Sequence, residues 1–405
     1  MNIDKSIPLV LIPSSATISF RGGLSLFIDR LIRHCTDRGF RVRRLIIPAW
    51  FEYLLVWPGL KAGQLLSRGL GTTWALLYRG IYTTCALWLR YLLTRERAIC
   101  FTTEPALLSF VGWPKQLCLI GVYSEGPTSK EEAVRGGVWR TIGRQRLGIR
   151  LLMAAERRSC LRAARIVADS PAGWKAMVSI FDLPLAKGQV VWQAIDTLEA
   201  PGAVRDRRAL RAQLEWPDET TVAIFTGQLY GIKGVDILFE AIRLQPDDRL
   251  RLVVLGTGVL ETSLRSACRS DQILRRRVHM AGYQSDVYYY LRGADIFVLP
   301  SRQEGTSTSL LEALSIGLAA VGSDVGGIHD VIKAGECGVL VPPDDPMALA
   351  TALRELMVHP HRRTEFGRRG REFVLRHCCA EDMAARYIKL FQELAFADIQ
   401  HRLNK

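Results

Sequence analysis

The sequence lacks the signatures of several common protein classes. Its cysteines form no Cys-x-x-Cys pair and it contains no Asp-x-Asp triplet, so we predict no metal site. No Gly-x-Gly-x-x-Gly opens a helix after a strand, which disfavours a nicotinamide-dependent oxidoreductase. The first 15 residues carry Asp4 and an apolar run that is too short for a signal peptide.

Long uncharged runs are also missing. In residues 51–95, Arg68, Arg79 and Arg90 are separated by runs of ten uncharged residues, about half of the roughly 20 that a membrane-spanning helix needs. Tyrosines and tryptophans alternate with these arginines, and this composition is typical of an element that lies in a bilayer interface. Two amphipathic helices packed inside the first domain are the alternative interpretation.

The composition is otherwise that of a globular protein. The 405 residues are 48% hydrophobic and 23% charged, and this length suits two domains. Residues 1–200 hold 27 Lys and Arg against 14 Asp and Glu, whereas residues 201–405 hold 27 against 26. A basic first half favours a polyanionic partner, and we expect peripheral contact with an anionic membrane. We do not expect nucleic acid, because no recognised nucleic-acid module accompanies the arginines.

The nine cysteines are scattered along the chain. An odd count without metal-binding spacing is typical of reduced, buried thiols. We therefore expect a cytoplasmic protein, associated with the inner face of the membrane.

Residues 295–331 form the stretch around which the second half is organised. An apolar run ending at Pro300 predicts a buried parallel strand, a polar loop follows, a helix is expected from about Ser309 to Ser315, and a second strand from Leu318 to Ser323. In open parallel sheets, ligands bind at the carboxyl ends of strands, where helix N-termini present free N–H groups. The loop from Arg302 to Ser307 is therefore the predicted place for a phosphate-bearing ligand.

Two carboxylates frame this loop. Glu304 lies in it and Glu312 follows eight residues later, a rise of about 12 Å if the intervening chain is helical. They cannot act on one atom, but they can hold two ends of an elongated ligand, such as a sugar and a ribose. The alternative interpretation is a capping box that begins at Ser309, in which Glu312 only satisfies a backbone N–H.

Other strand ends carry candidate phosphate contacts. Gly22 and Gly23 precede an amphipathic helix, and Gly227 and Lys233 follow the strand from Val222 to Thr226. Backbone N–H groups and an ammonium at such helix N-termini suit a diphosphate. A plain turn and a solvated lysine are the alternatives.

The organising stretch resembles the Glu, seven residues, Glu signature of retaining, nucleotide-sugar-dependent glycosyltransferases, the large glycosyltransferase group 1 family. Its flanking runs VLPS, EG, LLEAL and DVGGIHDVI agree with that family. The resemblance implies an α/β fold of the GT-B type, with two Rossmann-like domains, a cleft between them and a C-terminal helix crossing back. We place the domains at residues 1–200 and 201–385 and the crossing helix at 386–405.

The resemblance also implies roles for individual residues. Glu304 would orient the donor sugar and Glu312 would bind the ribose, while Lys233 would bind the diphosphate. Further donor contacts are expected from the turn Gly22 and Gly23, from Gly227, Gln228, Gly256 and Tyr283, and from the helix start Gly305, Thr306 and Ser307. The nucleotide-diphosphate sugar would be a co-substrate, and no other cofactor and no metal are expected.

Two positions depart from the family pattern. An arginine that usually follows the first glycine is Gln228 here, which weakens diphosphate binding or shifts it to Lys233 and Arg302. The histidine usual at one strand end is replaced by Tyr123, Ser124 and Glu125. Glu125 is our candidate for contact with the acceptor hydroxyl, and an exposed loop acid is the alternative.

The predicted function is that of a retaining, metal-independent glycosyltransferase. The expected acceptor is a lipid-linked or cell-envelope glycan, as in lipopolysaccharide or exopolysaccharide biosynthesis. The alternative is a degenerate, non-catalytic member that binds a nucleotide or a membrane within a glycan-assembly complex; Gln228 and the missing histidine favour it, and Lys233, Glu304 and Glu312 oppose it.

Overall fold

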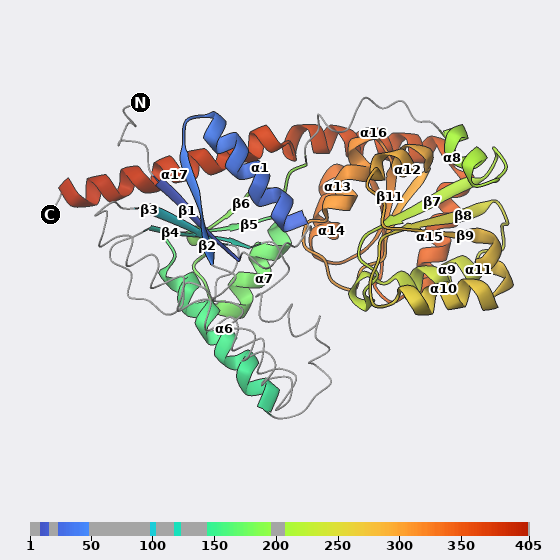
Figure 1. Cartoon of the computed structure of the whole chain (residues 1–405), viewed down its shortest axis with the longest axis horizontal. Helices are drawn as coiled ribbons and strands as arrows, with labels where there is room; N and C mark the ends of the chain where they lie inside the picture. The colour runs from blue at the N-terminus through green and yellow to red at the C-terminus, as the bar shows by residue number, and fades with distance from the viewer. Residues whose placement is uncertain are drawn as a thin grey trace. The chain divides into compact units, whose positions relative to one another are not determined.

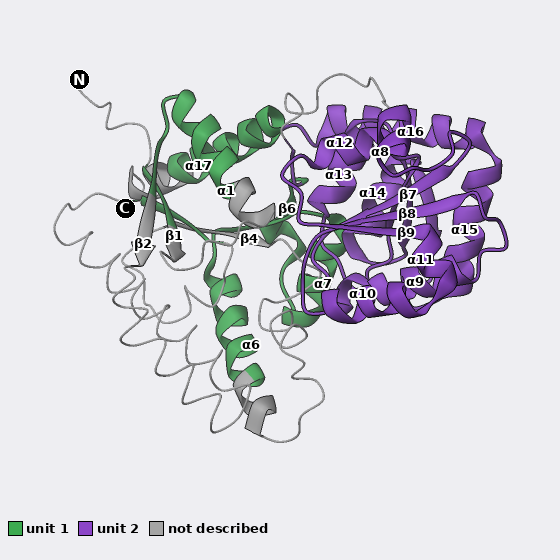
Figure 2. Ribbon diagram, turned by 45° about the vertical axis from the view of Figure 1, so that its right-hand side comes forward, with its two compact units in different colours: residues 1–192, 380–405 green, residues 193–379 purple. Residues whose placement is uncertain are grey.

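The chain divides into two compact units. The computed structural model describes residues 9–15, 23–47, 98–102, 117–122, 144–195 and 207–403. Unit 1 comprises residues 1–192 with 380–405, and unit 2 comprises residues 193–379 (Figure 2). The boundaries predicted from the sequence lie at 200/201 and 385/386, whereas the units divide at 192/193 and 379/380.

Unit 1 is built on a parallel sheet. In the described part of the chain its strand order is β2-β1-β3-β4-β5-β6, and every pairing is parallel. The strands are β1 (Leu9–Ser15), β2 (Arg41–Ile47), β3 (Ala98–Thr102), β4 (Leu117–Val122), β5 (Arg165–Ala168) and β6 (Gly188–Val190). The helices are α1 (Gly23–Asp37), α6 (Arg144–Arg162), α7 (Pro171–Phe181) and α17 (Ala380–Leu403), with the short helix η4 (Leu185–Lys187).

The last helix of the chain, α17, belongs to unit 1. It packs against α1, β3 and β4 (Figure 1). The ring of Tyr387 is fully buried and meets Phe101 of β3 edge-on, with the ring centroids 5.5 Å apart. The C-terminal helix thus returns to the N-terminal unit, because its aromatic face completes the core there.

Unit 2 has the doubly wound topology. Its sheet has the order β12-β11-β10-β7-β8-β9, with all strands parallel. The strands are β7 (Thr221–Thr226), β8 (Leu250–Leu255), β9 (Val278–Gly282), β10 (Ile296–Leu299), β11 (Ala319–Ser323) and β12 (Gly338–Val341). Strand order reverses between β7 and β10, and the crevice at the carboxyl ends of such a pair is where open α/β sheets bind ligands.

Helices cover both faces of this sheet. In Figure 1, α9, α10 and α11 lie on one side of the strands, and α12, α13 and α16 lie on the other. Their inward residues are apolar, as in α9, where Val235, Leu238, Phe239 and Ile242 are buried. The helices of unit 2 are α8 (Arg207–Gln213), α9 (Val235–Arg243), α10 (Glu261–Ser270), α11 (Gln272–Arg277), α12 (Val287–Gly293), α13 (Thr308–Ser315), α14 (Gly326–Gly335), α15 (Pro346–Val358) and α16 (Pro360–His377), with the short helix η5 (Gly231–Lys233).

A buried ion pair fixes the amino ends of β7 and β10. The Arg211 guanidinium is 1% exposed and lies 2.5 Å from the carboxylate of Asp295, which is 3% exposed. Arg211 also donates to the carbonyls of Thr220 and Gly293, while Asp295 accepts from the N–H of Val222. Burial lowers the pKa of Arg211, so the carboxylate is needed to compensate its charge.

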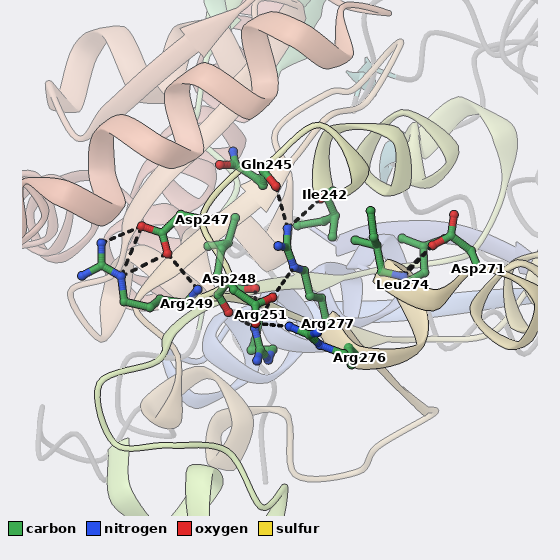
Figure 3. A network of polar contacts seen from close by, with 12 residues as sticks. Ile242, Gln245, Asp247, Asp248, Arg249, Arg251, Asp271, Leu274, Arg276 and Arg277 are labelled. Carbon is green, nitrogen blue, oxygen red and sulfur yellow. Dashed lines mark hydrogen bonds and ion pairs between the residues drawn. The ribbon is translucent and has the colours of Figure 1, made fainter.

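A second polar network lies where β8 begins and α11 ends (Figure 3). The Asp248 carboxylate contacts Arg276 and Arg277, and Arg249 pairs with Asp247. The hydrogen bonds from Arg249 lower the pKa of Asp247 to about 2. Since these groups lie at the amino edge of the sheet, they hold α11 to β8 and are remote from the ligand-binding edge.

Seven cysteines of the described residues form no disulfide, and five of these seven are buried. Burial raises the pKa of Cys35, Cys160 and Cys337 to about 12, which makes these thiols inert. Among the described residues, no helix combines the length and apolarity that crossing a membrane requires. Residues 51–95 lie outside the described part of the chain.

Replacing Asp295 with alanine should destabilise unit 2 by about 3–5 kcal/mol, because the Arg211 charge would remain buried without a partner. Urea unfolding followed by circular dichroism measures this change. Glu219→Ala, at an exposed acid directly before Thr220, should change stability by less than about 0.5 kcal/mol. Equal effects of the two substitutions would contradict the assigned role of the ion pair.

Candidate functional site

An ion pair joins the two loops at the point where the strand order reverses. Lys233 ends η5, which follows β7, and Glu304 lies in the loop that follows β10. The Lys233 ammonium lies 2.7 Å from Oε1 and 2.5 Å from Oε2 of Glu304. The side chains are 23% and 12% exposed, so both are largely withdrawn from water yet remain accessible to a ligand.

Ser301 adds a third hydrogen bond to this pair. It is completely buried, and its hydroxyl donates to Oε2 of Glu304 over 3.0 Å. Oε2 therefore accepts two hydrogen bonds, from Lys233 and Ser301, whereas Oε1 accepts one. Each carboxylate oxygen has two acceptor positions and an ammonium has three N–H groups, so one position on Oε1 and one N–H of Lys233 are left for a ligand.

Glycines let the loops at this edge approach backbone to backbone. Gly234 has a φ of +65°, and a Cβ there would lie 1.9 Å from the carbonyl oxygen of Pro300. A Cβ on Gly256, at φ +130°, would lie 1.8 Å from the carbonyl oxygen of Gly227. No other residue fits these positions, so the sequence signal at Gly227 and Gly256 reflects close packing of the loops after β7 and β8.

The N-terminus of α14 supports the Glu304 loop from another side. The Gly327 N–H donates to the carbonyl of Glu304 over 3.2 Å. A Cβ on Gly327 would lie 2.5 Å from backbone atoms of Gly305 and Thr306. The loop that carries Glu304 is thus enclosed by α14 and by the loop after β7.

Arg302 forms ion pairs that hold three segments of unit 2 together. Its guanidinium binds both oxygens of Asp236 at 2.7 and 2.9 Å and Oδ1 of Asp344 at 2.7 Å, and it also donates to the Gly231 carbonyl. These hydrogen bonds raise the pKa of Arg302. Two aspartates therefore neutralise Arg302, and four of its five N–H groups are engaged, which favours weakened diphosphate binding over a shift of that contact to Arg302.

The helix after the loop begins at Thr308, and its N-cap is Ser307. The Ser307 hydroxyl accepts from the Leu310 N–H over 3.4 Å, which places Glu312 at the fifth helical position. A capping box requires the acid at the third position, so the capping-box interpretation of Glu312 is wrong. Gln193 donates to the Thr308 hydroxyl over 2.9 Å, a contact between residues distant in sequence that we did not predict.

The other predicted site residues have different surroundings. Gly256 donates its N–H to the carbonyl of Gly282, next to Tyr283, which is 67% exposed beyond β9. Gln228 is exposed, and Thr306 and Ser307 are 6% exposed each. Gly23 is the first residue of α1, while Gly22 and Glu125 lie outside the described residues. The structure therefore gathers the loops of unit 2 and leaves these two candidates as predictions.

Sequence analysis did not identify three polar groups at this edge. One of them is the Ser301 hydroxyl, described above. The other two, the Thr226 hydroxyl and the Gln303 side-chain nitrogen, are buried without a hydrogen-bond partner. Thr226 ends β7 and Gln303 precedes Glu304. Similar unpaired groups occur away from this edge, at the Ser159 hydroxyl and Arg251 Nε, so they do not by themselves mark a ligand site, and a lone Thr or Gln beside a strand end carries no distinctive sequence signal.

Solved structures define the class of the fold. The chain is similar to Anabaena Alr3699/HepE in complex with UDP, with a TM-score of 0.67 and 13% identity over 96% of this chain and 100% of that one. It is also similar to WaaG, a glycosyltransferase involved in lipopolysaccharide biosynthesis, with a TM-score of 0.66 and 17% identity over 94% of this chain and 99% of that one. The expected α/β fold of the GT-B type is confirmed.

Sequence comparison then defines the family. Residues 206–373 match the family described as glycosyl transferases group 1. The match covers this part of the chain and confirms the resemblance found in the sequence.

Curated relatives match a similar part of the chain. A D-inositol 3-phosphate glycosyltransferase of Kineococcus radiotolerans is 32% identical over 232 residues, 51% of this chain and 52% of the relative. The lipopolysaccharide core biosynthesis glycosyltransferase LpsE of Rhizobium meliloti is 27% identical over 221 residues, 55% of this chain and 59% of the relative. The chain thus spans little more than half the length of these relatives.

Gly327→Ala should destabilise unit 2 by about 1–3 kcal/mol, because the added methyl group meets rigid backbone at Gly305 and Thr306. Urea unfolding of the purified chain measures the change. Gly231→Ala is the matched control, because a Cβ at Gly231 has nothing within 4 Å. If both variants unfold at the same urea concentration as the wild type, the Glu304 loop is not enclosed as described.

Proposed function

We propose that the chain is a retaining glycosyltransferase that transfers a sugar from a nucleotide-diphosphate donor to an acceptor hydroxyl. The observation that carries this proposal is the Lys233–Glu304 pair at the strand-order reversal of unit 2. The family match over residues 206–373 supports it.

The hydrogen-bonding capacity left on the pair fits such a donor. Lys233 retains one N–H for a phosphate oxygen, and Glu304 retains one acceptor position for a hydroxyl. A ligand that presents an anion beside a hydroxyl within a few ångströms satisfies both groups. A sugar attached to a diphosphate has this arrangement, whereas a carboxylate without a hydroxyl satisfies only Lys233.

The proposed chemistry uses charge that develops on the leaving group. As the bond between the sugar and the diphosphate breaks, negative charge grows on the diphosphate. Lys233 and the N-terminal N–H groups of α13, near Thr306 and Ser307, would stabilise that charge. Glu304 would orient the sugar and Glu312 would bind the ribose. Retention of configuration at the sugar is assigned on the family resemblance.

The acceptor is assigned by chemistry and by the named relatives. One relative acts in lipopolysaccharide core biosynthesis, and the first half of the chain carries most of the excess positive charge. We therefore propose a lipid-linked or cell-envelope glycan as the acceptor, contact with Glu125, and association with the inner face of an anionic membrane.

A non-catalytic nucleotide-binding protein is the second candidate. Gln228 favours it, because a neutral, exposed side chain stands where the family places a cation. The ion pairs that Arg302 forms with Asp236 and Asp344 favour the non-catalytic candidate as well. Turnover of a donor separates the two candidates.

A thermal-shift screen of UDP-, GDP- and ADP-sugars tests the donor. We expect one nucleotide to raise the Tm of the wild type and to lose this effect in Glu312→Ala, because the ribose contact is removed. A product assay with that donor then tests transfer. Donor binding without turnover would favour the non-catalytic candidate, and no binding by any donor would contradict both.

Lys233→Ala should lower kcat about 10² to 10³-fold, because one stabilising contact to the developing charge is removed. The change is measured by product formation at saturating donor. Lys333→Ala, at an exposed lysine of α14, should keep kcat within about twofold. A Lys233→Ala enzyme with wild-type kcat would exclude the assigned role.

A further inference from the structure

We infer that Ser301 is a positioning residue that fixes the plane of the Glu304 carboxylate, so that one oxygen keeps an open acceptor position for a hydroxyl of the donor sugar. By occupying Oε2, Ser301 leaves Oε1 as the atom that accepts a hydrogen bond from one sugar hydroxyl. The inference rests on the proposed function and deepens it, because it assigns the sugar contact to one atom and the orientation of that atom to a second residue.

The difference between the two oxygens carries the inference. Oε2 accepts from the Ser301 hydroxyl at 3.0 Å and from Lys233 at 2.5 Å, so its acceptor positions are both filled. Oε1 accepts only from Lys233, at 2.7 Å. A ligand hydroxyl therefore finds an acceptor on Oε1 and none on Oε2.

Ser301 is the rigid member of this group. The Pro300 carbonyl before it lies against Gly234, where no Cβ fits, and the Arg302 N–H after it donates to the Ile232 carbonyl over 2.8 Å. Its neighbours thus fix its backbone on both sides, and its side chain is fully buried. Lys233, in contrast, reaches Glu304 through a flexible four-carbon stem, so the ammonium alone would allow the carboxylate to turn.

The removal of the hydroxyl should act through Glu304. In Ser301→Ala, Oε2 loses a charge-assisted hydrogen bond that water does not replace, because the site is buried. The carboxylate plane is then free to rotate away from the angle at which the open acceptor position of Oε1 faces the sugar, and the fraction of bound donor in the productive orientation falls. We expect kcat to fall about tenfold, while the Kd of the free nucleotide, without a sugar, stays unchanged.

The test is a double-mutant cycle with a matched control. Wild type, Ser301→Ala, Glu304→Ala and the double variant are compared for kcat, donor KM and the Kd of the free nucleotide, with the donor identified by the screen above. Ser323→Ala is the control, because Ser323 ends the neighbouring strand β11 and is 1% exposed. It should keep kcat within about twofold.

A positioning role predicts strong coupling between the two sites. Ser301→Ala should cost about tenfold in the wild-type background and less than twofold in the Glu304→Ala background. An equal loss in both backgrounds, or an equal loss in Ser323→Ala, would overturn the inference and leave Ser301 with a role in packing only.

A readout without donor separates this inference from the proposed function. The Tm of Ser301→Ala, Glu304→Ala and the double variant should be non-additive, because each single change breaks the same hydrogen bond. Additive shifts overturn the Ser301 contact itself. Non-additive Tm shifts support the contact between Ser301 and Glu304. If no donor is turned over as well, the glycosyltransferase assignment is overturned, and with it the role of Ser301 in orienting the sugar.

Discussion

The attraction between Lys233 and Glu304 is the interaction on which the functional edge of unit 2 depends. It links the segments that follow β7 and β10, the two strands between which the order of the sheet reverses. The glycines that let these segments meet, the buried Ser301 hydroxyl and the start of α14 all support the pair. Opposite charges held this close neutralise each other while retaining hydrogen-bonding capacity, so the edge is prepared for a ligand that carries both an anion and a hydroxyl.

Much of this arrangement was predictable from the sequence, and each feature that was not predicted has its own physical reason. Lys233 and Glu304 each follow a buried apolar run, so their positions at strand ends were evident. Their direct contact was not, because it joins residues 71 positions apart and depends on strand order. The sequence alone places the helix start near Ser309, because four hydroxyl residues follow one another at 306–309 and any of them can cap a helix. Only the fold selects Ser307.

Arg302 shows that the sequence does not reveal the partners of a side chain when those partners lie on other segments. A cation in a phosphate-binding loop is a reasonable candidate ligand, and the sequence gives no sign that Asp236 and Asp344, on two other segments, lie within hydrogen-bond distance of it. At the opposite edge of the sheet, Arg211 and Asp295 form a pair that is almost completely buried. The Arg211–Asp295 pair is structural because it is buried. The Lys233–Glu304 pair is partly exposed and therefore remains open to a ligand.

The ion pairs between Arg302 and two aspartates affect how nucleotide binding depends on ionic strength. With Gln228 neutral, Arg302 neutralised and Lys233 already paired, the described edge has little net positive charge to attract a diphosphate from a distance. Attraction between exposed net charges weakens as salt rises, whereas short contacts to N–H groups in a partly buried site are much less screened. Nucleotide affinity at this site should therefore vary little with salt concentration, and any strongly salt-dependent step should arise from the basic first half of the chain.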